Sequence, residues 1–312
     1  MESLKKDNRP ICGSGKICSL EMSRIYPRYA KLAFNHILKI REKTMICFRT
    51  FAFFVLLLLA PFLAAAESRD ALVAGINDRF EQNREIALSI WEFAELGYLE
   101  EQSTDLLQET LAAAGFQVKA GIAGIPTAFV AEAGSGKPVI AVLAEFDALP
   151  GITQTASPVR EEIPGKAGGQ ACGHHLFGTA SVSAAVVVKQ WLADNDIKGT
   201  IRVYGTPAEE GGSGKVYMVR EGLFADVDAV LSWHPGDVNR ATATPTLANR
   251  SARFDFHGVS AHAAGAPEKA RSALDGVEAF NYMTNLMREH VPQETRIHYV
   301  ITSGGKAPNV VP

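Results

Sequence analysis

Side chains that bind metals occur in four short clusters along this chain, spread over an alternating pattern of apolar runs and helical segments. The clusters are Cys172-Gly173-His174, Glu209-Glu210, His234 and His262. Thiolate, imidazole and carboxylate groups are the usual protein ligands of transition metals. The fold is therefore constrained to bring distant segments together at one place.

The segment between residues 67 and 244 alternates between helical and strand-like patterns. Apolar residues recur at spacings of three and four over 70–95, and further helices are predicted at 104–114, with Ser103 as N-cap, at 175–193 and at 215–221. Strands are predicted at 127–131, 139–145, 201–204 and 229–233. Strands that alternate with helices favour the α/β class, with a mostly parallel sheet and helices on its faces.

Three of the clusters fall where such a sheet binds ligands. Glu209-Glu210 follows the strand at 201–204, His234 closes the strand at 229–233, and Cys172 ends a Gly- and Pro-rich loop at 147–173. Ligands of open α/β sheets bind at the carboxyl ends of the strands, so these residues can converge. Each residue taken alone also fits a plainer role, such as a buried thiol or a hydrogen-bonded core histidine.

The acidic pair Glu209-Glu210 carries the most specific chemical expectation. Adjacent carboxylates stay ionised together only near a compensating charge such as a divalent cation. One carboxylate can then bind the cation while its neighbour takes a proton from an activated water. The alternative is a solvated acidic turn, which is the expected role of Glu161-Glu162.

A second, smaller domain is predicted for residues 245–312. Residues 247–256 and 296–302 alternate between apolar and polar and are predicted to be strands, and an amphipathic helix is predicted at 272–289. The sequence therefore predicts a metal-binding α/β domain at 67–244 followed by an α+β domain at 245–312.

The N-terminal region has the pattern of an export signal. Basic residues precede the apolar run at 52–63, and Ala64-Ala65-Ala66 follows it. We predict a signal peptide at 45–66 after an extension at 1–44, and therefore a periplasmic or secreted protein with no stable membrane span after cleavage. An uncleaved N-terminal anchor is the alternative. The mature chain would keep Cys172 as its only cysteine, so no internal disulfide could form.

Charge and motifs exclude several other classes of function. The 312-residue chain has a formal net charge of -3, and its basic residues are scattered rather than gathered in a stripe, so nucleic-acid binding is not expected. There is no H-E-x-x-H helix motif, no G-x-S-x-G nucleophile elbow and no complete phosphate-binding loop.

Several runs taken together resemble a known enzyme family. The runs LAEFDALPG, ACGHHLFGTA, GTPAEEGGSGK, SWHP, GVSAHAA and GGKAPNVVP occur in the order found in the two-metal aminoacylase and carboxypeptidase family. The most similar branch contains aminobenzoyl-glutamate, hippurate, N-acyl-amino-acid and auxin-conjugate amidohydrolases. The resemblance spans residues 70–312 and implies a catalytic domain with an inserted ferredoxin-like lid. It also implies hydrolysis of the amide bond between an acyl or aroyl group and an amino acid, or of a dipeptide.

The resemblance also assigns roles to individual residues. It implies that two divalent ions, Mn or Zn, are bound by Cys172, His174, Glu210 and His234, and that Glu209 is the general base. Asp147 would be a supporting carboxylate, His262 a lid residue that stabilises the oxyanion in a partner subunit, and Asn309 a substrate contact. A homodimer formed through the lid would follow. A loop-capping role for Asp147 and a surface role for His262 are the alternatives.

The chain departs from the family pattern at two points. His175 stands where the branch has Asp or Asn beside the metal-binding histidine, so it would take the place of that supporting residue. The family also returns from the lid to the catalytic domain and there supplies a last metal-binding histidine, whereas this chain is expected to stop within the lid. An inactive, truncated remnant and a non-catalytic periplasmic metal- or ligand-binding protein are therefore the rival hypotheses.

Overall fold

The computed structural model describes residues 69–241 and 245–312 and divides the chain into two compact units. The division falls between Asp237 and Val238. The predicted extension at 1–44 and the predicted signal peptide at 45–66 lie outside the described residues. Each unit is described by itself below.

The first unit is built on a five-stranded sheet with the strand order β1-β2-β6-β3-β7. The strands are β1 (Gln117–Ala120), β2 (Phe129–Ser135), β3 (Val139–Ala144), β6 (Gly199–Gly205) and β7 (Ala229–Leu231). Strand β3 is parallel to both β6 and β7, while β2 is antiparallel to β6 and to β1. The predicted α/β class with a mostly parallel sheet is confirmed, and β2 is the strand that opposes the others.

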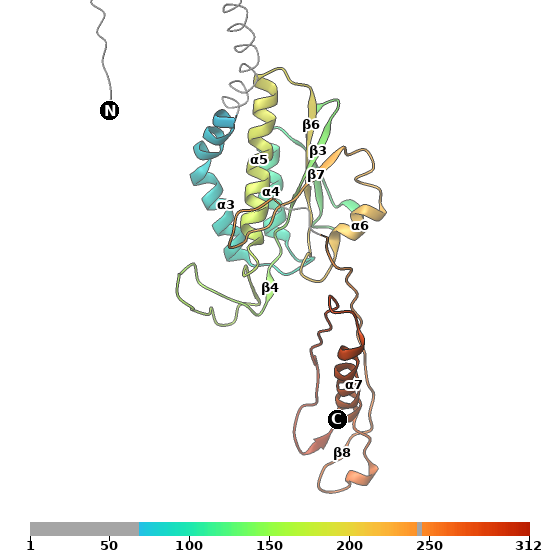
Figure 1. The fold of residues 1–312 in the computed structure, drawn as a ribbon. Helices are drawn as coiled ribbons and strands as arrows, with labels where there is room; N and C mark the ends of the chain where they lie inside the picture. The colour runs from blue at the N-terminus through green and yellow to red at the C-terminus, as the bar shows by residue number, and fades with distance from the viewer. Residues whose placement is uncertain (1–68, 242–244) are drawn as a thin grey trace, which may run out of the picture. The chain divides into compact units, whose positions relative to one another are not determined.

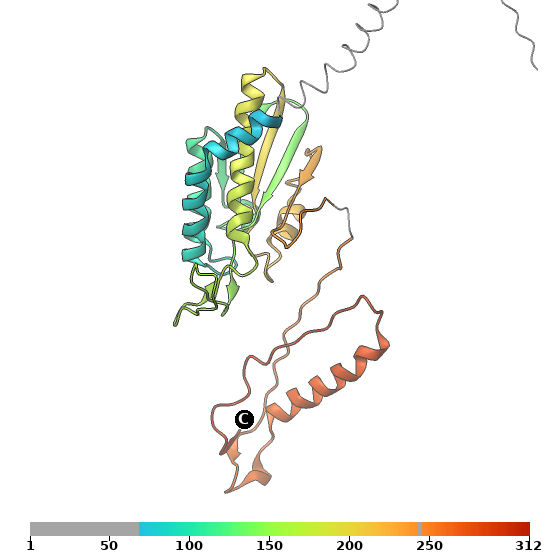
Figure 2. The same cartoon turned by 60° about the vertical axis from the view of Figure 1, so that its left-hand side comes forward.

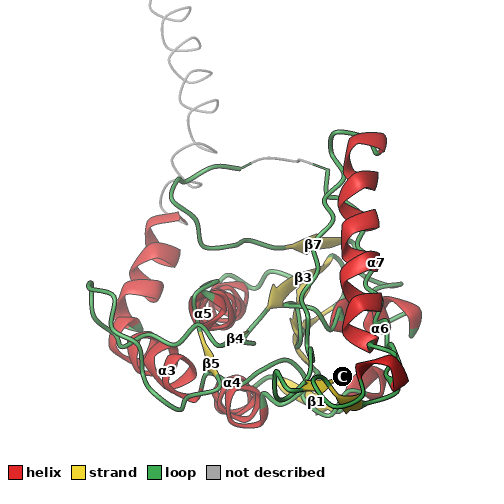
Figure 3. Cartoon of the chain, turned by 90° about the horizontal axis from the view of Figure 1, so that it is seen from below, coloured by secondary structure: helices red, strands yellow, loops and turns green. Residues whose placement is uncertain are grey.

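Helices cover both faces of this sheet. Helices α3 (Phe80–Phe93), α4 (Glu101–Ala113) and α5 (His174–Asp194) lie on one face, and α6 (Gly214–Arg220) lies on the other (Figures 1 and 2). Figure 3 shows α5 nearly end-on, with α3 and α4 beside it. By length and composition α5 could cross a membrane, but it is the central core helix of the unit, with nine buried residues.

The alternation of side chains along the strands divides the apolar residues between two cores. On β6, Ile201 and Val203 pack with Leu107 of α4 and Val182 of α5, whereas the neighbouring Tyr204 packs with Met218 of α6. Successive side chains of a strand point to opposite faces, so one apolar strand supplies both layers. This double burial accounts for the nearly continuous apolar sequence of β3 and β6.

Helix α4 begins two residues earlier than its predicted cap. Ser103 was predicted as the N-cap, but the helix starts at Glu101 and Ser103 is buried within it. The Glu95 carboxylate accepts hydrogen bonds from the backbone N–H groups of Gln102 and Ser103 and from the Ser103 hydroxyl. The side chain of Glu95, several residues before the helix, therefore accepts hydrogen bonds from backbone N–H groups of its first turn. The N-cap prediction was wrong because it considered only the residue next to the predicted start of the helix.

Four short elements lie in segments where the sequence pattern predicted neither a helix nor a strand. Strand β1 and the 3-10 helix η1 (Ile122–Gly124) precede β2, and the long loop contains β4 (Leu149–Pro150) paired with β5 (Gly168–Gly169). Strand β1 is largely exposed, so its sequence lacks the apolar run from which a strand could be predicted. The remainder of the loop between β4 and β5 is irregular, as expected.

The second unit is organised around one helix. It contains α7 (Ala273–Met287), the 3-10 helices η2 (Pro267–Lys269) and η3 (Arg288–His290), and the two-residue strands β8 (Ala261–His262) and β9 (Val310–Val311). Ser272 caps α7 by accepting a hydrogen bond from Asp275 N at 3.0 Å. The strands predicted at 247–256 and 296–302 are absent from the described residues, because alternation alone does not supply a hydrogen-bonding neighbour.

The two glycines at the ends of β6 provide a test of the packing. A Cβ atom at Gly205 would lie 2.1 Å from the ring of Phe129, whereas one at Gly199 would meet nothing closer than 3.5 Å. We expect Gly205→Ala to lower the free energy of unfolding by about 1–3 kcal/mol in urea titrations, because overpacking displaces core side chains. Gly199→Ala is the control and should stay within about 0.5 kcal/mol of wild type. Equal effects would contradict this packing.

Candidate metal centre

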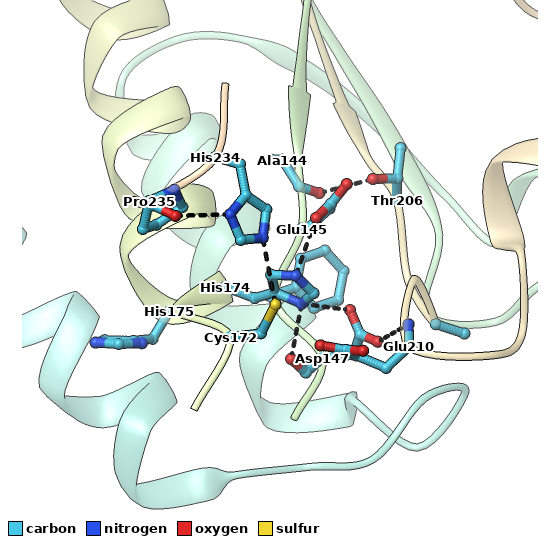
Figure 4. Close-up of polar contacts among 12 residues, drawn as sticks. Ala144, Glu145, Asp147, Cys172, His174, His175, Thr206, Glu210, His234 and Pro235 are labelled. Atoms are coloured by element: carbon cyan, nitrogen blue, oxygen red, sulfur yellow. Dashed lines mark hydrogen bonds and ion pairs between the residues drawn. The ribbon is translucent and has the colours of Figure 1, made fainter. Parts of the chain in front are cut away.

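Three neighbouring strands deliver acidic and imidazole side chains to the same edge of the sheet. Strand β3 ends at Ala144 and is followed by Glu145 and Asp147, β6 leads into the loop that carries Glu209 and Glu210, and β7 is followed by His234. Because β3, β6 and β7 are parallel, their carboxyl ends lie together. The sequence-predicted convergence of these segments is seen within the first unit (Figure 4).

A left-handed glycine brings the cysteine and its neighbouring histidine into this edge. Gly173 has φ +87° and precedes the first residue of α5, so the chain turns sharply between Cys172 and His174. The Cys172 Sγ atom lies 3.3 Å from His234 Nε2, and the rings of His174 and His234 are 5.5 Å apart. A Cβ at position 173 would press on Pro235 at 3.1 Å, which also favours glycine there.

His174 is held in one orientation by Asp147. Its ring is fully buried, and Nδ1 lies 3.0 Å from both the backbone oxygen and the carboxylate Oδ1 of Asp147. Both of these atoms only accept hydrogen bonds, so Nδ1 carries the proton and Nε2 of the neutral ring has a free lone pair. A metal-binding imidazole is commonly held this way by a carboxylate or a carbonyl group.

Buried polar atoms without hydrogen bonds gather around His174. Glu145 Oε2, His174 Nε2 and Glu210 Oε1 are buried and lack a hydrogen-bond partner among the residues that the structure describes. Glu145 Oε2 lies only 3.1 Å from His174 Nε2, but their geometry is not that of a hydrogen bond. An unpaired buried polar group costs about 1–3 kcal/mol, and a cation would satisfy all three atoms.

Two overlapping groups of side chains have ligand atoms close enough to hold a metal ion. Cys172, His174 and His234 form one group, and Glu145, His174 and Glu209 form the other, with ligand atoms within 4.8 Å of one another in each. Thiolate and imidazole suit Zn, whereas carboxylates suit harder ions such as Mn. The donor set at the edge of the sheet therefore fits divalent cations.

Burial and an excess of acidic groups shift the pKa values of this cluster. Burial, a hydrogen bond to Glu210 and the charges of nearby carboxylates raise the pKa of Cys172 to about 12. Burial alone would lower the pKa of His174, but the hydrogen bond and charge of Asp147 outweigh it and raise that pKa. The charges of nearby carboxylates contribute to both pKa shifts, and such a concentration of negative charge attracts cations.

Glu145 and Lys215 were not predicted from the sequence as part of this cluster. Glu145 is buried, and its Oε1 atom lies 2.5 Å from Lys215 Nζ at the start of α6. Burial raises the pKa of Glu145, and the charge of Lys215 partly offsets this. The spacing of Glu145 and Asp147 by two residues after a buried strand is the signal that could have placed both on one side of the chain.

His175 lies away from the cluster although it was predicted to support it. Its ring packs edge-on against Trp91 with centroids 4.9 Å apart and points away from Cys172 and His234 (Figure 4). Burial lowers its pKa to about 4. Asp147, by contrast, contacts His174 and accepts a hydrogen bond from Glu210 N at 2.9 Å, as a supporting carboxylate would.

His262 and Asn309 belong to the second unit. His262 is exposed, and its Nδ1 accepts hydrogen bonds from the N–H groups of Ala264 and Gly265 at 3.2 and 3.1 Å. The backbone oxygen of Asn309 accepts a hydrogen bond from Ala263 N at 3.0 Å, so the two predicted residues lie on adjoining segments. Their functional roles stay predictions.

With this fold and this cluster of candidate metal ligands at its strand ends, the chain belongs to peptidase family M20/M25/M40, whose model it matches over residues 141–308. The predicted family is therefore confirmed. The chain is 47% identical to one of the subunits of p-aminobenzoyl-glutamate hydrolase of Escherichia coli K12, over 76% of this chain and 50% of that protein. It is 30% identical to the human Xaa-Arg dipeptidase, over 76% of this chain and 54% of that protein.

One solved structure is similar to this chain at the level of the fold. An aminohydrolase structure from methicillin-resistant Staphylococcus aureus matches with a TM-score of 0.50 and 22% identity, over 78% of this chain and 64% of that chain. The present chain spans about half the length of the curated relatives that it matches.

The hydrogen bond between Asp147 and His174 predicts an effect on metal affinity. We expect Asp147→Asn to weaken zinc binding about 10- to 100-fold in isothermal titration calorimetry, because a neutral amide raises the basicity of His174 as a ligand less than a carboxylate does. Asp105→Asn, an exposed position on α4, is the control and should bind zinc like wild type. Unchanged affinity in a folded Asp147→Asn protein would contradict the proposed support of His174 by the Asp147 carboxylate.

Proposed function

We propose that this protein hydrolyses the amide bond between an acyl or aroyl group and an amino acid, with aminobenzoyl-glutamate, N-acyl amino acids and dipeptides as the substrate class. The observation that carries this proposal is the placement of Glu209-Glu210 beside the cluster of Cys172, His174 and His234, of which His174 is the buried member. The curated relatives are named as an aminobenzoyl-glutamate hydrolase and as dipeptidases, which supports an enzyme over a non-catalytic binding protein.

Cys172, His174, Glu210 and His234 would hold two divalent ions, with Zn or Mn as the candidates. Their donor set fits these ions, and the buried atoms Glu210 Oε1 and His174 Nε2 have no other partner among the described residues. When bound, such ions polarise a carbonyl oxygen and make water easier to deprotonate. Asp147 fixes the proton on His174 Nδ1 and so keeps Nε2 free for a metal.

Glu209 is suited to move the proton during hydrolysis. It is exposed, whereas its neighbour Glu210 is partly buried, so its carboxylate can reach both water and a substrate nitrogen. A ligand oxygen of Glu209 lies within 4.8 Å of ligand atoms of His174 and Glu145. We assign Glu209 as the base that takes a proton from the attacking water and returns it to the leaving nitrogen. His262, with Asn309 nearby, would act on the substrate from the second unit.

Replacement of the base separates catalysis from metal binding. We expect Glu209→Gln to lower kcat on N-acyl and aminobenzoyl amino acids about 10²- to 10⁴-fold, because no carboxylate remains to move the proton. Metal content measured by mass spectrometry should stay at the wild-type value. Glu162→Gln removes an exposed acidic group of the loop and is the control. Wild-type turnover by Glu209→Gln would refute this role, and no turnover of any substrate by wild type would refute the proposed function.

A homodimer formed through the second unit is part of the proposal. None of the described residues of this unit is buried, and large apolar side chains such as Phe254, Tyr282 and Met283 are exposed on it. Exposed apolar surface of this kind commonly marks an interface. The relatives include proteins named as two different subunits of p-aminobenzoyl-glutamate hydrolase, so a subunit of another sequence is the competing partner.

We also propose that the protein is exported, as the apolar run at 52–63 and Ala64-Ala65-Ala66 suggest. N-terminal sequencing of the protein isolated from its host tests this. A mature terminus at or next to Glu67 is the expected result, whereas a protein that retains residues 45–66 would contradict cleavage.

A further inference from the structure

One buried carboxylate of the first unit has no part in the metal centre. Glu100 lies just before α4 and is fully buried. Its Oε1 atom accepts a hydrogen bond from Ala208 N at 2.8 Å, and Oε2 accepts one from the Thr127 hydroxyl at 3.0 Å. Burial raises its pKa, and these hydrogen bonds partly offset the rise. Burying a carboxylate costs free energy unless hydrogen bonds compensate it. The groups that donate hydrogen bonds to Glu100 therefore indicate which part of the structure it stabilises.

The main partner of Glu100 is the residue immediately before the catalytic pair. Ala208 is buried and has φ +54°, in the left-handed region that non-glycine residues rarely adopt. This conformation turns the chain into the acidic loop, which we define as residues 208–212. The loop closes through a hydrogen bond from Gly212 N to Ala208 O at 3.0 Å. A charged acceptor on Ala208 N stabilises this strained turn.

The other end of the acidic loop contacts the segment at 97–100, which connects α3 to α4 and contains Glu100. The Tyr98 hydroxyl donates a hydrogen bond to Gly212 O at 2.5 Å, and Tyr98 also has a positive φ of 69°. The acidic loop and the segment at 97–100 pack closely against each other between these two hydrogen bonds. A Cβ at Gly97 would lie 2.9 Å from Ala208 Cβ, and one at Gly212 would lie 2.6 Å from the Tyr98 ring. The segment at 97–100 therefore contacts the acidic loop on both sides of Glu209.

We infer that Glu100 is a positioning residue for the general base, acting through the backbone of Ala208, with Tyr98 as the second anchor of the acidic loop. The inference rests on the proposed function of Glu209 and names residues outside the metal centre on which that function depends. Asp147 holds Glu210 N within the same loop, so three side chains fix the direction of the acidic pair. A base displaced by about 1 Å can lose about 10²-fold in rate.

Steady-state kinetics of zinc- or manganese-loaded variants test this inference. We expect Glu100→Ala to lower kcat about 10²-fold while KM changes less than about threefold, because substrate contacts are untouched. Glu100→Gln should restore most of kcat, since its amide oxygen can still accept from Ala208 N. The matched control is Glu95→Ala, which removes the hydrogen bonds that Glu95 accepts at the start of α4 but none from the acidic loop.

Amide hydrogen exchange supplies a readout that needs no substrate. We expect exchange at residues 208–212 to quicken in Glu100→Ala and in Tyr98→Phe but not in Glu95→Ala. The inference is overturned if folded Glu100→Ala keeps the wild-type kcat, or if Glu95→Ala loses as much kcat as Glu100→Ala. If Glu100→Ala fails to fold, the Tyr98→Phe variant tests the inference instead. Wild-type kcat and wild-type amide exchange at residues 208–212 in that variant would then reject the inference that residues 98 and 100 hold the acidic loop. If wild type itself turns over no substrate, the proposed function fails, while exchange still decides whether Glu100 holds the loop.

Discussion

The hydrogen bond from His174 Nδ1 to Asp147 is the interaction on which the site depends. It joins the carboxyl end of β3 to the first residue of α5, and it is fully buried. Because it fixes the ring, His174 Nε2 faces Glu145 Oε2 at 3.1 Å without a hydrogen bond between them. The same Asp147 carboxylate accepts from Glu210 N, so one side chain aligns the imidazole and the acidic loop.

The rest of the first unit supports this arrangement. Helix α5 packs tightly enough on the sheet that a Cβ at Gly178 would lie 2.7 Å from the backbone oxygen of Glu145. Trp233, next to His234, donates a hydrogen bond to Ser181 of α5 at 3.2 Å. The parallel strands bring the segments to one edge, and these contacts set the directions of the side chains. Precise geometry of this kind is what catalytic and metal sites require of their surroundings.

Much of the fold was predictable because burial leaves a strong pattern in the sequence. Strands β3 and β6 are largely buried on both faces and therefore form apolar runs, and the end of β6 indicated the position of Glu209 and Glu210. Strand β7, which precedes His234, was predicted from its apolar residues although all three of them are exposed. Exposed β1 has no such pattern. The alternating segments at 247–256 and 296–302 looked like strands but have no neighbour to pair with among the described residues.

Contacts between distant residues account for what the sequence could not predict. Lys215 pairs with Glu145 across 70 positions, and Glu100 reaches Ala208 across 108. No local pattern encodes either contact, since each depends on how α4, β3 and α6 pack. Glu95 shows the same limit on a smaller scale, because it caps α4 from outside the usual capping position.

The central claim is that a divalent cation binds at the edge of the sheet with Cys172 among its ligands. X-ray absorption spectroscopy of the zinc-loaded chain from residue 67 onward tests it most directly, with Cys172→Ser as the control, because Cys172 is the single cysteine among residues 67–312. We expect a sulfur neighbour at about 2.3 Å together with nitrogen and oxygen neighbours at about 2.0–2.2 Å. A zinc shell made only of nitrogen and oxygen atoms would contradict the claim.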